Sequence, residues 1–247
     1  MLRLLLVALM SLLPLRVAAA EEIVAGLSQA RVAITADFSG TDILIFGAVK
    51  RIAPAPIEPP LGVIITVAGP PQTITVRRKD RRMGIWVNAD SRAIGNVPSF
   101  YAVTSSGPLD QLLAPDADAR YHISAPQFIP AGTDTYFGDA LLRIREDEGA
   151  FKLTPGGVSL DEDTLFRTAI TLPANLTEGL YTTRIFLTRG GQVIDSYATS
   201  INVSMVGIER LTFNLATDQP LIYGLLCVAI AVFAGWGAAT VFRLIRG

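Results

Sequence analysis

The sequence predicts a mainly β protein: an immunoglobulin-like β-sandwich with a helical insertion, followed by one C-terminal transmembrane helix. Three observations predict it. Runs of alternating or β-branched residues recur about every ten residues and are separated by Gly and Pro turns, as in sandwiches. One amphipathic helical stretch interrupts these runs in the middle of the chain. Finally, Leu221–Phe242 is a long apolar run that contains no charged residue.

The N-terminus has the pattern of an export signal. Arg3 is followed by the apolar run Leu4–Leu13 and by three alanines before Glu21, which is typical of a cleaved secretory signal. The alternative is an uncleaved anchor, but the apolar run is too short to span a bilayer. We therefore expect residues 1–20 to be a signal peptide and the mature chain to begin at or near Glu21.

The first β-rich part runs from Glu21 to Ser106. Four prolines make Ala53–Pro60 a stiff loop, because proline fixes φ and lacks the backbone donor. Alternating or apolar segments on either side of it predict strands. The expected strands are 31–36, Asp42–Val49, Leu61–Ala68, a hairpin of Thr73–Val76 with Ile85–Val87, and Ser99–Val103.

A basic segment marks the end of that hairpin. Five cations lie within six residues: Arg77, Arg78, Lys79, Arg81 and Arg82. Such a cluster attracts phosphate headgroups, an anionic ligand or an acidic partner. The alternative is a solvated turn whose charges discourage edge-to-edge aggregation.

The middle of the chain predicts a helical insertion over about 108–149. Pro108–Ala114 is compatible with one or two helical turns. A longer helix is expected from Thr133 or Asp134, as the cap, to about Glu148. Its apolar residues share one face and Gly149 suits its end, so the helix should lie on a sheet. These residues are Phe137, Ala140, Leu141 and Ile144.

The second β-rich part contains three longer strands: Leu165–Leu172, Leu180–Thr188 and Val193–Val206. Gly190-Gly191 joins the last two in a tight hairpin, because glycine adopts the positive φ that such turns need. Together with the first part, these strands predict one external domain over residues 21–206, arranged as one lobe or two sub-lobes.

Residues 207–219 form a short juxtamembrane linker. Leu211, Phe213 and Leu215 alternate with polar residues, so the segment either continues the last strand or lies on the outer leaflet. A transmembrane helix is expected over 220–243, since its uncharged core would extend roughly 33 Å. Arg243 and Arg246 follow at once, so residues 244–247 are expected in the cytoplasm and the domain outside.

Small residues recur on one side of this helix: Gly224, Ala231, Gly235 and Ala239. At this spacing they let another helix approach closely, which predicts a helix–helix contact. The alternative is a helix that is surrounded by lipid alone.

Several chemistries are disfavoured by composition. All 22 Asp and Glu, but only 17 of the 21 Lys and Arg, lie within residues 21–220; the resulting charge of −5 argues against nucleic-acid binding. His122 is the only histidine, in a segment that we interpret as strand-like and structural. Cys227 is the only cysteine and lies in the apolar run, so neither a multi-histidine metal site nor a disulfide in the domain is expected. No nucleophile elbow or phosphate loop is present, and we expect no catalytic, cofactor-binding or metal-binding residues.

Several short blocks are distributed over most of the mature chain. They are Phe38–Thr41, Ile45–Ala48, Gly84–Asn88, Pro98–Val103, Leu165–Arg167, Leu172–Asn175, Gly179 with Tyr181, Gly207–Arg210, Tyr223-Gly224 and Gly235-Trp236. Together these blocks resemble a family of alphaproteobacterial transmembrane proteins, conserved hypothetical proteins with a single C-terminal membrane helix. The resemblance implies a Gram-negative inner membrane, a periplasmic domain and an association with a sulfite-exporter-type permease, but brings no catalytic residues.

These observations predict a non-enzymatic accessory of an integral membrane protein. The main alternative is a periplasmic module that binds an anionic ligand or envelope polymer through Arg77–Arg82. A third is a hydrolase with two carboxylates that only the fold would bring together. The oligomeric state is left open.

Overall fold

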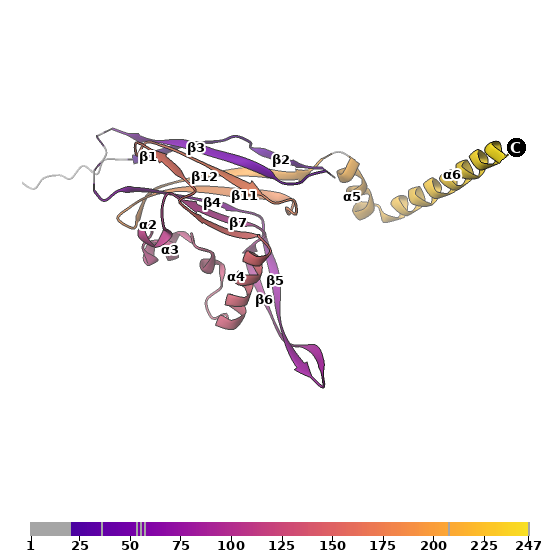
Figure 1. The fold of residues 1–247 in the computed structure, drawn as a ribbon, viewed down its shortest axis with the longest axis horizontal. Helices are drawn as coiled ribbons and strands as arrows, with labels where there is room; N and C mark the ends of the chain where they lie inside the picture. The colour runs from indigo at the N-terminus through magenta and orange to yellow at the C-terminus, as the bar shows by residue number, and fades with distance from the viewer. Residues whose placement is uncertain are drawn as a thin grey trace, which may run out of the picture.

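The computed structural model describes residues 21–35, 37–52, 54, 56, 58–206 and 208–246. The predicted signal peptide, 1–20, lies outside the described residues, as do Gly207 and Gly247. The described chain is mainly β, and its strands form two larger sheets and one separate hairpin. An elongated β body carries a hairpin arm and, at one end, two helices that lead away from it (Figure 1).

The two larger sheets form a sandwich. In spatial order, the first sheet contains β1 (Glu21–Leu27), β3 (Thr41–Arg51), β10 (Leu165–Leu172) and β9 (Ser159–Asp161). The second contains, again in spatial order, β2 (Arg31–Ile34), β12 (Gln192–Met205), β11 (Gly179–Arg189), β4 (Leu61–Ala68), β7 (Tyr101–Ser105) and β8 (Phe151–Pro155).

This strand order is that of an immunoglobulin-like domain, and the predicted fold class is confirmed. β1-β3-β10-β9 corresponds to strands A-B-E-D, and β12-β11-β4-β7 to G-F-C-C′. The hydroxyl of Tyr181, near the start of β11, donates a hydrogen bond of 3.0 Å to the carbonyl oxygen of Thr177. This is the tyrosine corner of such domains.

The sequence of β4 explains how the sandwich and the insertion share one sheet. Every residue from Leu61 to Val67 is buried, because both faces of this central strand are covered. Val63 and Ile65 join the core between the two sheets. Ile64 points the other way, into a second apolar cluster under the helices.

The helical insertion covers that second face. It contains α2 (Leu109–Leu112), α3 (Pro115–Tyr121), the 3₁₀ helix η1 (Ala125–Phe128) and α4 (Thr135–Asp147). The Asp134 side chain caps α4 by accepting a hydrogen bond of 2.9 Å from the backbone N–H of Tyr136. Of the predicted apolar face, Phe137 and Leu141 are buried beneath α4 and Ala140 packs against the same cluster, but Ile144 is exposed, so that part of the prediction is wrong.

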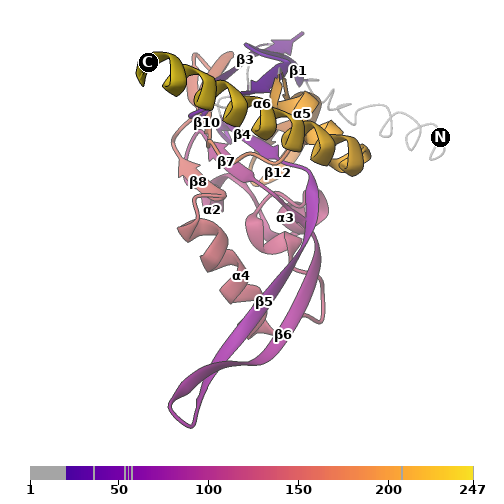
Figure 2. The same ribbon diagram turned by 90° about the vertical axis from the view of Figure 1, so that its right-hand side faces the viewer.

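The third sheet is a long hairpin, the arm, made of β5 (Pro71–Arg82) and β6 (Ile85–Pro98). The arm is an outward extension of the β4–β7 pair. The N–H of Gly69 bonds to the carbonyl of Phe100 and the N–H of Ser99 to that of Pro70, which joins the two ladders. Figures 1 and 2 show the arm projecting from the body beside α4.

Several sequence-based expectations need correction. Glu21–Leu27 forms a strand that was not predicted, although it pairs with β3 throughout its length. The hairpin strands are far longer than the predicted Thr73–Val76 and Ile85–Val87. The outer half of the hairpin is exposed and rich in charged residues, so its sequence resembles that of a loop. His122 is not in a strand: it follows α3 with a left-handed φ of 51°.

The linker is a helix, α5 (Ile208–Asp218), so the alternative of a continued strand is wrong. A strand that ran on past its neighbours would leave its backbone groups unpaired, whereas a helix satisfies them internally. After Gln219, α6 (Pro220–Arg246) contains a stretch, Pro220–Val241, that is long and apolar enough to cross a membrane. Membrane association is therefore supported, through the one candidate transmembrane helix found among the described residues.

Candidate functional site

The outer part of the arm brings the predicted basic residues into solvent. Arg77, Arg78, Lys79, Arg81 and Arg82 all lie on β5 and are exposed. Arg78 is 3.8 Å from Asp90 and Arg82 is 3.8 Å from Asp80, both in solvent-exposed pairs. Exposed pairs of this kind are weak, and the five cations outnumber these two carboxylates, so the segment keeps a net positive charge.

An apolar apex lies at the end of this basic segment. Met83 and Gly84 form the turn, both with positive φ. Met83 is fully exposed, and the side chains of Ile85 and Trp86 are 65% and 68% exposed. These residues were not predicted as a site from the sequence. The signal was present as the apolar stretch 83–87, uninterrupted by polar residues and next to five cations.

The root of the arm is fixed to the body. Val76, Ile94 and Val97 are buried in the cluster that also contains Phe137 and Leu141 of α4. The Arg78 guanidinium lies over the Tyr136 ring, 5.7 Å from its centroid. These contacts hold the inner half of the arm, while the outer half has two exposed faces.

The second predicted site lies on α6. Gly224, Ala231, Gly235 and Ala239 are exposed on the described part of the helix. At about 100° per residue they fall on one side. A Cβ built at Gly224 or Gly235 meets no atom within 4 Å, so a second helix has room to approach. The predicted contact itself remains a prediction.

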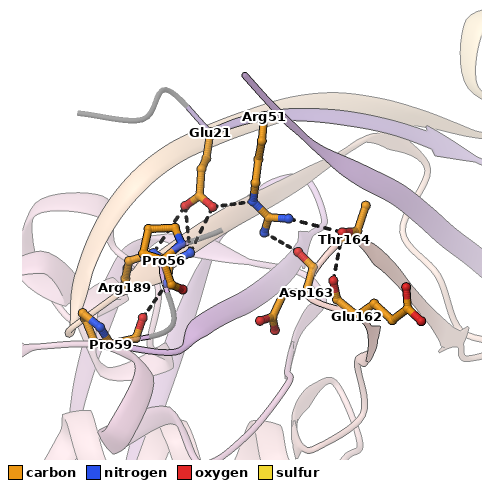
Figure 3. Close-up of polar contacts among 8 residues, drawn as sticks. All are labelled: Glu21, Arg51, Pro56, Pro59, Glu162, Asp163, Thr164 and Arg189. Carbon is orange, nitrogen blue, oxygen red and sulfur yellow. Dashed lines mark hydrogen bonds and ion pairs between the residues drawn. The ribbon is translucent and has the colours of Figure 1, made fainter. Parts of the chain in front are cut away.

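A buried ion-pair cluster ties the first residue of β1 to both sheets (Figure 3). The Glu21 carboxylate lies 2.6 Å from Nε of Arg51 on β3 and 3.0 Å from Nη2 of Arg189 on β11. The Glu21 side chain is 4% exposed and each arginine side chain 11%. Arg189 also donates to the carbonyls of Pro56 and Pro59. The cluster locks the proline-rich loop and the strand ends together, which is a structural role.

A small polar cavity of about 90 Å³ lies where α4 meets the sandwich. Two buried polar atoms that border it, Oγ of Ser99 and Nε of Arg145, have no hydrogen-bond partner among the described residues. Tyr181 lines the same cavity, and burial raises the pKa of its hydroxyl. Such a cavity has the size and polarity to hold water molecules. Arg145 is already paired with Glu148 at 3.0 Å, so the cavity is not a strongly cationic anion site.

A wider, open hollow of about 550 Å³ lies on the outer face of the first sheet. Val24, Phe46 and Leu165 expose apolar side chains there. Gly47 lines the same hollow, and a Cβ there would lie 2.5 Å from the Phe166 ring and 2.6 Å from the carbonyl oxygen of Val24, so this position needs glycine. Among the described residues that line the hollow, Asp161 and Arg167 are the charged ones, in an exposed ion pair at 3.9 Å, and none is Ser, Cys or His.

Two residues of the helical insertion make structural contacts, His122 through its backbone and Asp118 through its carboxylate. The carbonyl of His122 accepts a 2.8 Å hydrogen bond from Arg184. Both carboxylate oxygens of Asp118 accept hydrogen bonds within its own loop, from Ser124 and Gln127. Among the residues that the structure describes, no group of three or more His, Cys, Asp or Glu is placed to hold a metal ion.

Comparison with known proteins adds one finding. A family model described as "Putative transmembrane protein (Alph_Pro_TM)" matches residues 22–244. No curated protein and no solved structure matches the chain. The match includes the sandwich, the arm, the helical insertion and nearly all of α6.

Proposed function

The chain belongs to the Alph_Pro_TM family of transmembrane proteins, and on that premise we propose that it is a non-enzymatic accessory of another integral membrane protein. In this proposal α6 crosses the inner membrane, the sandwich faces the periplasm after removal of residues 1–20, and the chain ends in the cytoplasm. The absence of Lys and Arg between Arg210 and Arg243 supports this orientation.

The small-residue face of α6 carries the proposal. A helix that only anchors a domain in a membrane needs a long apolar surface and no special face. The side of α6 opposite the small residues is of this kind, with bulky apolar residues such as Phe233. The face of Gly224, Ala231, Gly235 and Ala239 lets a neighbouring backbone approach closely. The partner that fits is a permease-like protein with several membrane helices. A sulfite-exporter-type permease is the specific candidate implied by the sequence resemblance.

Face-specific crosslinking in native membranes tests the helix contact. A photoreactive residue is placed at Ala231 in one variant of the full chain and at Phe233, on the opposite side, in another. We expect an integral membrane protein to crosslink at Ala231 but not at Phe233. Equal crosslinking at both positions, or crosslinking to lipid alone, would contradict the proposal.

A matched pair of substitutions strengthens the test. Gly235→Leu fills the proposed contact face, whereas Gly237→Leu makes the same chemical change elsewhere on the helix; a Cβ at either position meets no atom within 4 Å. We expect Gly235→Leu to reduce crosslinking at Ala231 by about tenfold, which corresponds to about 1.4 kcal/mol, because the leucine would hold the two helix backbones apart. Gly237→Leu should leave it unchanged.

The arm favours a second candidate function, the binding of an anionic ligand or envelope polymer. The supporting observation is the row of exposed cations from Arg77 to Arg82, in which Asp80 is the only acidic residue. Binding of a labelled anionic polysaccharide by the full chain in detergent, lost in an Arg81→Glu, Arg82→Glu variant, would support this candidate. Unchanged binding by the variant would exclude the arm as its site.

A further inference from the structure

The tip of the arm combines two properties that a soluble surface rarely combines. Its apex, Met83, Ile85 and Trp86, is apolar and exposed, while the adjoining strand carries five cations. Tryptophan and basic residues together are typical of protein segments that lie at the interface between lipid headgroups and acyl chains. We propose that the arm tip docks on the surface of an anionic bilayer, the same bilayer that α6 crosses.

The strand register distributes both kinds of residue over both faces of the ribbon. Arg81 lies opposite Trp86, and Arg82 opposite Ile85. Opposite residues share a face and successive pairs alternate, so each face near the apex presents one cation and one large apolar side chain. Cations on two faces cannot converge on one small ion. A headgroup layer surrounds an inserted tip and can neutralise charges on every side.

The turn places the apolar side chains at the extreme end. Met83 and Gly84 both have positive φ, which is the conformation of a tight two-residue hairpin turn. Met83 at the turn can therefore reach the acyl boundary. Ile85 and Trp86 lie level with Arg82 and Arg81, whose long side chains can extend to the phosphates, and Lys79 lies further from the apex. An apolar apex followed by a level that mixes large apolar side chains with cations suits the boundary between acyl chains and headgroups.

The arm projects clear of the body. In Figure 1 it slants toward the end of the body from which α5 and α6 leave, and in Figure 2 its tip and α6 lie at opposite ends of the view. Its root is packed against α4 through Val76, Ile94 and Val97, so this direction is built into the fold. Anchoring by α6 keeps a bilayer at high effective concentration near the tip.

An acidic protein surface is the competing occupant. The proposal favours lipid because the anchor supplies a bilayer to every copy of the chain, and because an apolar apex with cations on both faces matches a layered environment. The inference rests on the membrane anchoring in the proposed function, but not on a protein partner or on which way α6 is inserted.

Reconstitution of the full chain into vesicles tests it. Trp236→Phe leaves Trp86 as the only tryptophan, since the chain contains two. The chain is placed in phosphatidylcholine vesicles with or without phosphatidylglycerol, using brominated acyl chains to quench tryptophan fluorescence. With phosphatidylglycerol we expect a blue shift of Trp86 emission and quenching by bromine near the headgroups. Each face of the vesicle carries the same lipids, so the result does not depend on orientation or on a partner.

Two charge-matched variants separate a specific tip from net charge. Lys79→Gln with Arg81→Gln and Arg82→Gln removes three tip cations, whereas Arg31→Gln with Arg120→Gln and Arg143→Gln removes three exposed cations elsewhere. Each cation near an anionic surface is expected to contribute about fivefold to tip docking, so the tip variant should reduce docking by about 100-fold. The second variant should resemble the parent.

Three results would overturn the proposal. Trp86 could remain unquenched in phosphatidylglycerol vesicles, or the tip variant could be quenched as fully as the parent. The third result concerns acrylamide, a water-soluble quencher. If soluble polyglutamate protected Trp86 from acrylamide in phosphatidylcholine vesicles to the same extent as phosphatidylglycerol does, the tip would be assigned to an acidic protein surface. Circular dichroism of each variant verifies that the exposed substitutions leave the fold intact.

Discussion

Replacing Glu21 by Gln should destabilise the domain far more than any other single charge removal at its N-terminal end. The Glu21 carboxylate faces two guanidinium groups, at 2.6 Å and 3.0 Å, and all three side chains are nearly excluded from solvent. A neutral amide would leave two arginine cations close together without their counter-charge. Breaking a buried ion pair in this way costs about 3–5 kcal/mol.

The adjacent residue is the control. Glu22 lies 3.0 Å from Lys50, but both side chains are more than 60% exposed, so Glu22→Gln should change stability by at most about 1 kcal/mol. Thermal unfolding of the full chain in detergent, followed by the β-sheet circular dichroism signal, measures both variants. For a domain of this size, we expect a Tm decrease of about 10 °C for Glu21→Gln and at most about 3 °C for Glu22→Gln. Equal decreases would refute the reasoning that burial of the cluster determines its energy.

Three further predictions follow from buried groups and special backbone positions. Burial raises the pKa of Tyr101 to about 12 from its usual 10, so the folded state keeps this proton more tightly than the unfolded state. The resulting stabilisation is complete below pH 10 and is lost as the pH rises to 12. In urea unfolding, the fall in unfolding free energy between pH 10 and 12 should be about 3 kcal/mol smaller for Tyr101→Phe than for the parent. Gly69→Ala should lower stability by about 1–3 kcal/mol, because the added Cβ would lie 2.9 Å from the Tyr181 ring, whereas Gly95→Ala, with no atom nearer than 3.9 Å, should be nearly neutral in the same assay. Asp134→Ala removes the cap of α4 and should lower the unfolding free energy by about 1 kcal/mol, with an unchanged value arguing against that cap.

The part of the fold that periodicity determines could be predicted from the sequence. β4 and β10 match the expected ranges to the residue, because both are rich in apolar and β-branched residues and each ends at a proline-containing turn. The α4 helix was also predictable, since its apolar face and its Asp134 cap are both local signals. The single apolar anchor needs only length and lack of charge to be recognised.

Features that depend on distant partners were not predictable in the same way. β1 exists because it pairs with β3, and Glu21 reaches arginines that lie 30 and 168 residues further along the chain. The alternation of Leu211, Phe213 and Leu215 resembled a strand, yet without a neighbour to pair with, the segment is helical. The cations of the candidate tip site could be found in the sequence. The exposure of Ile85 and Trp86 could not, because it depends on their strand having no other element packed on it.

The length of the arm follows from where it is inserted in the sandwich. β4 and β7 are neighbours in the sheet, so the chain between them can leave and return at one point, and the hydrogen bonds of Gly69 and Ser99 continue the ladder across that point. Gly69 is needed there because a side chain would meet both Ser99 and Tyr181 of the tyrosine corner. The arm therefore starts from one of the most constrained positions in the fold. A rigid root with an exposed tip is the arrangement expected of an arm whose apex binds a surface outside the domain. If the root were flexible, binding would have to fix the orientation of the arm, and this loss of entropy would weaken it.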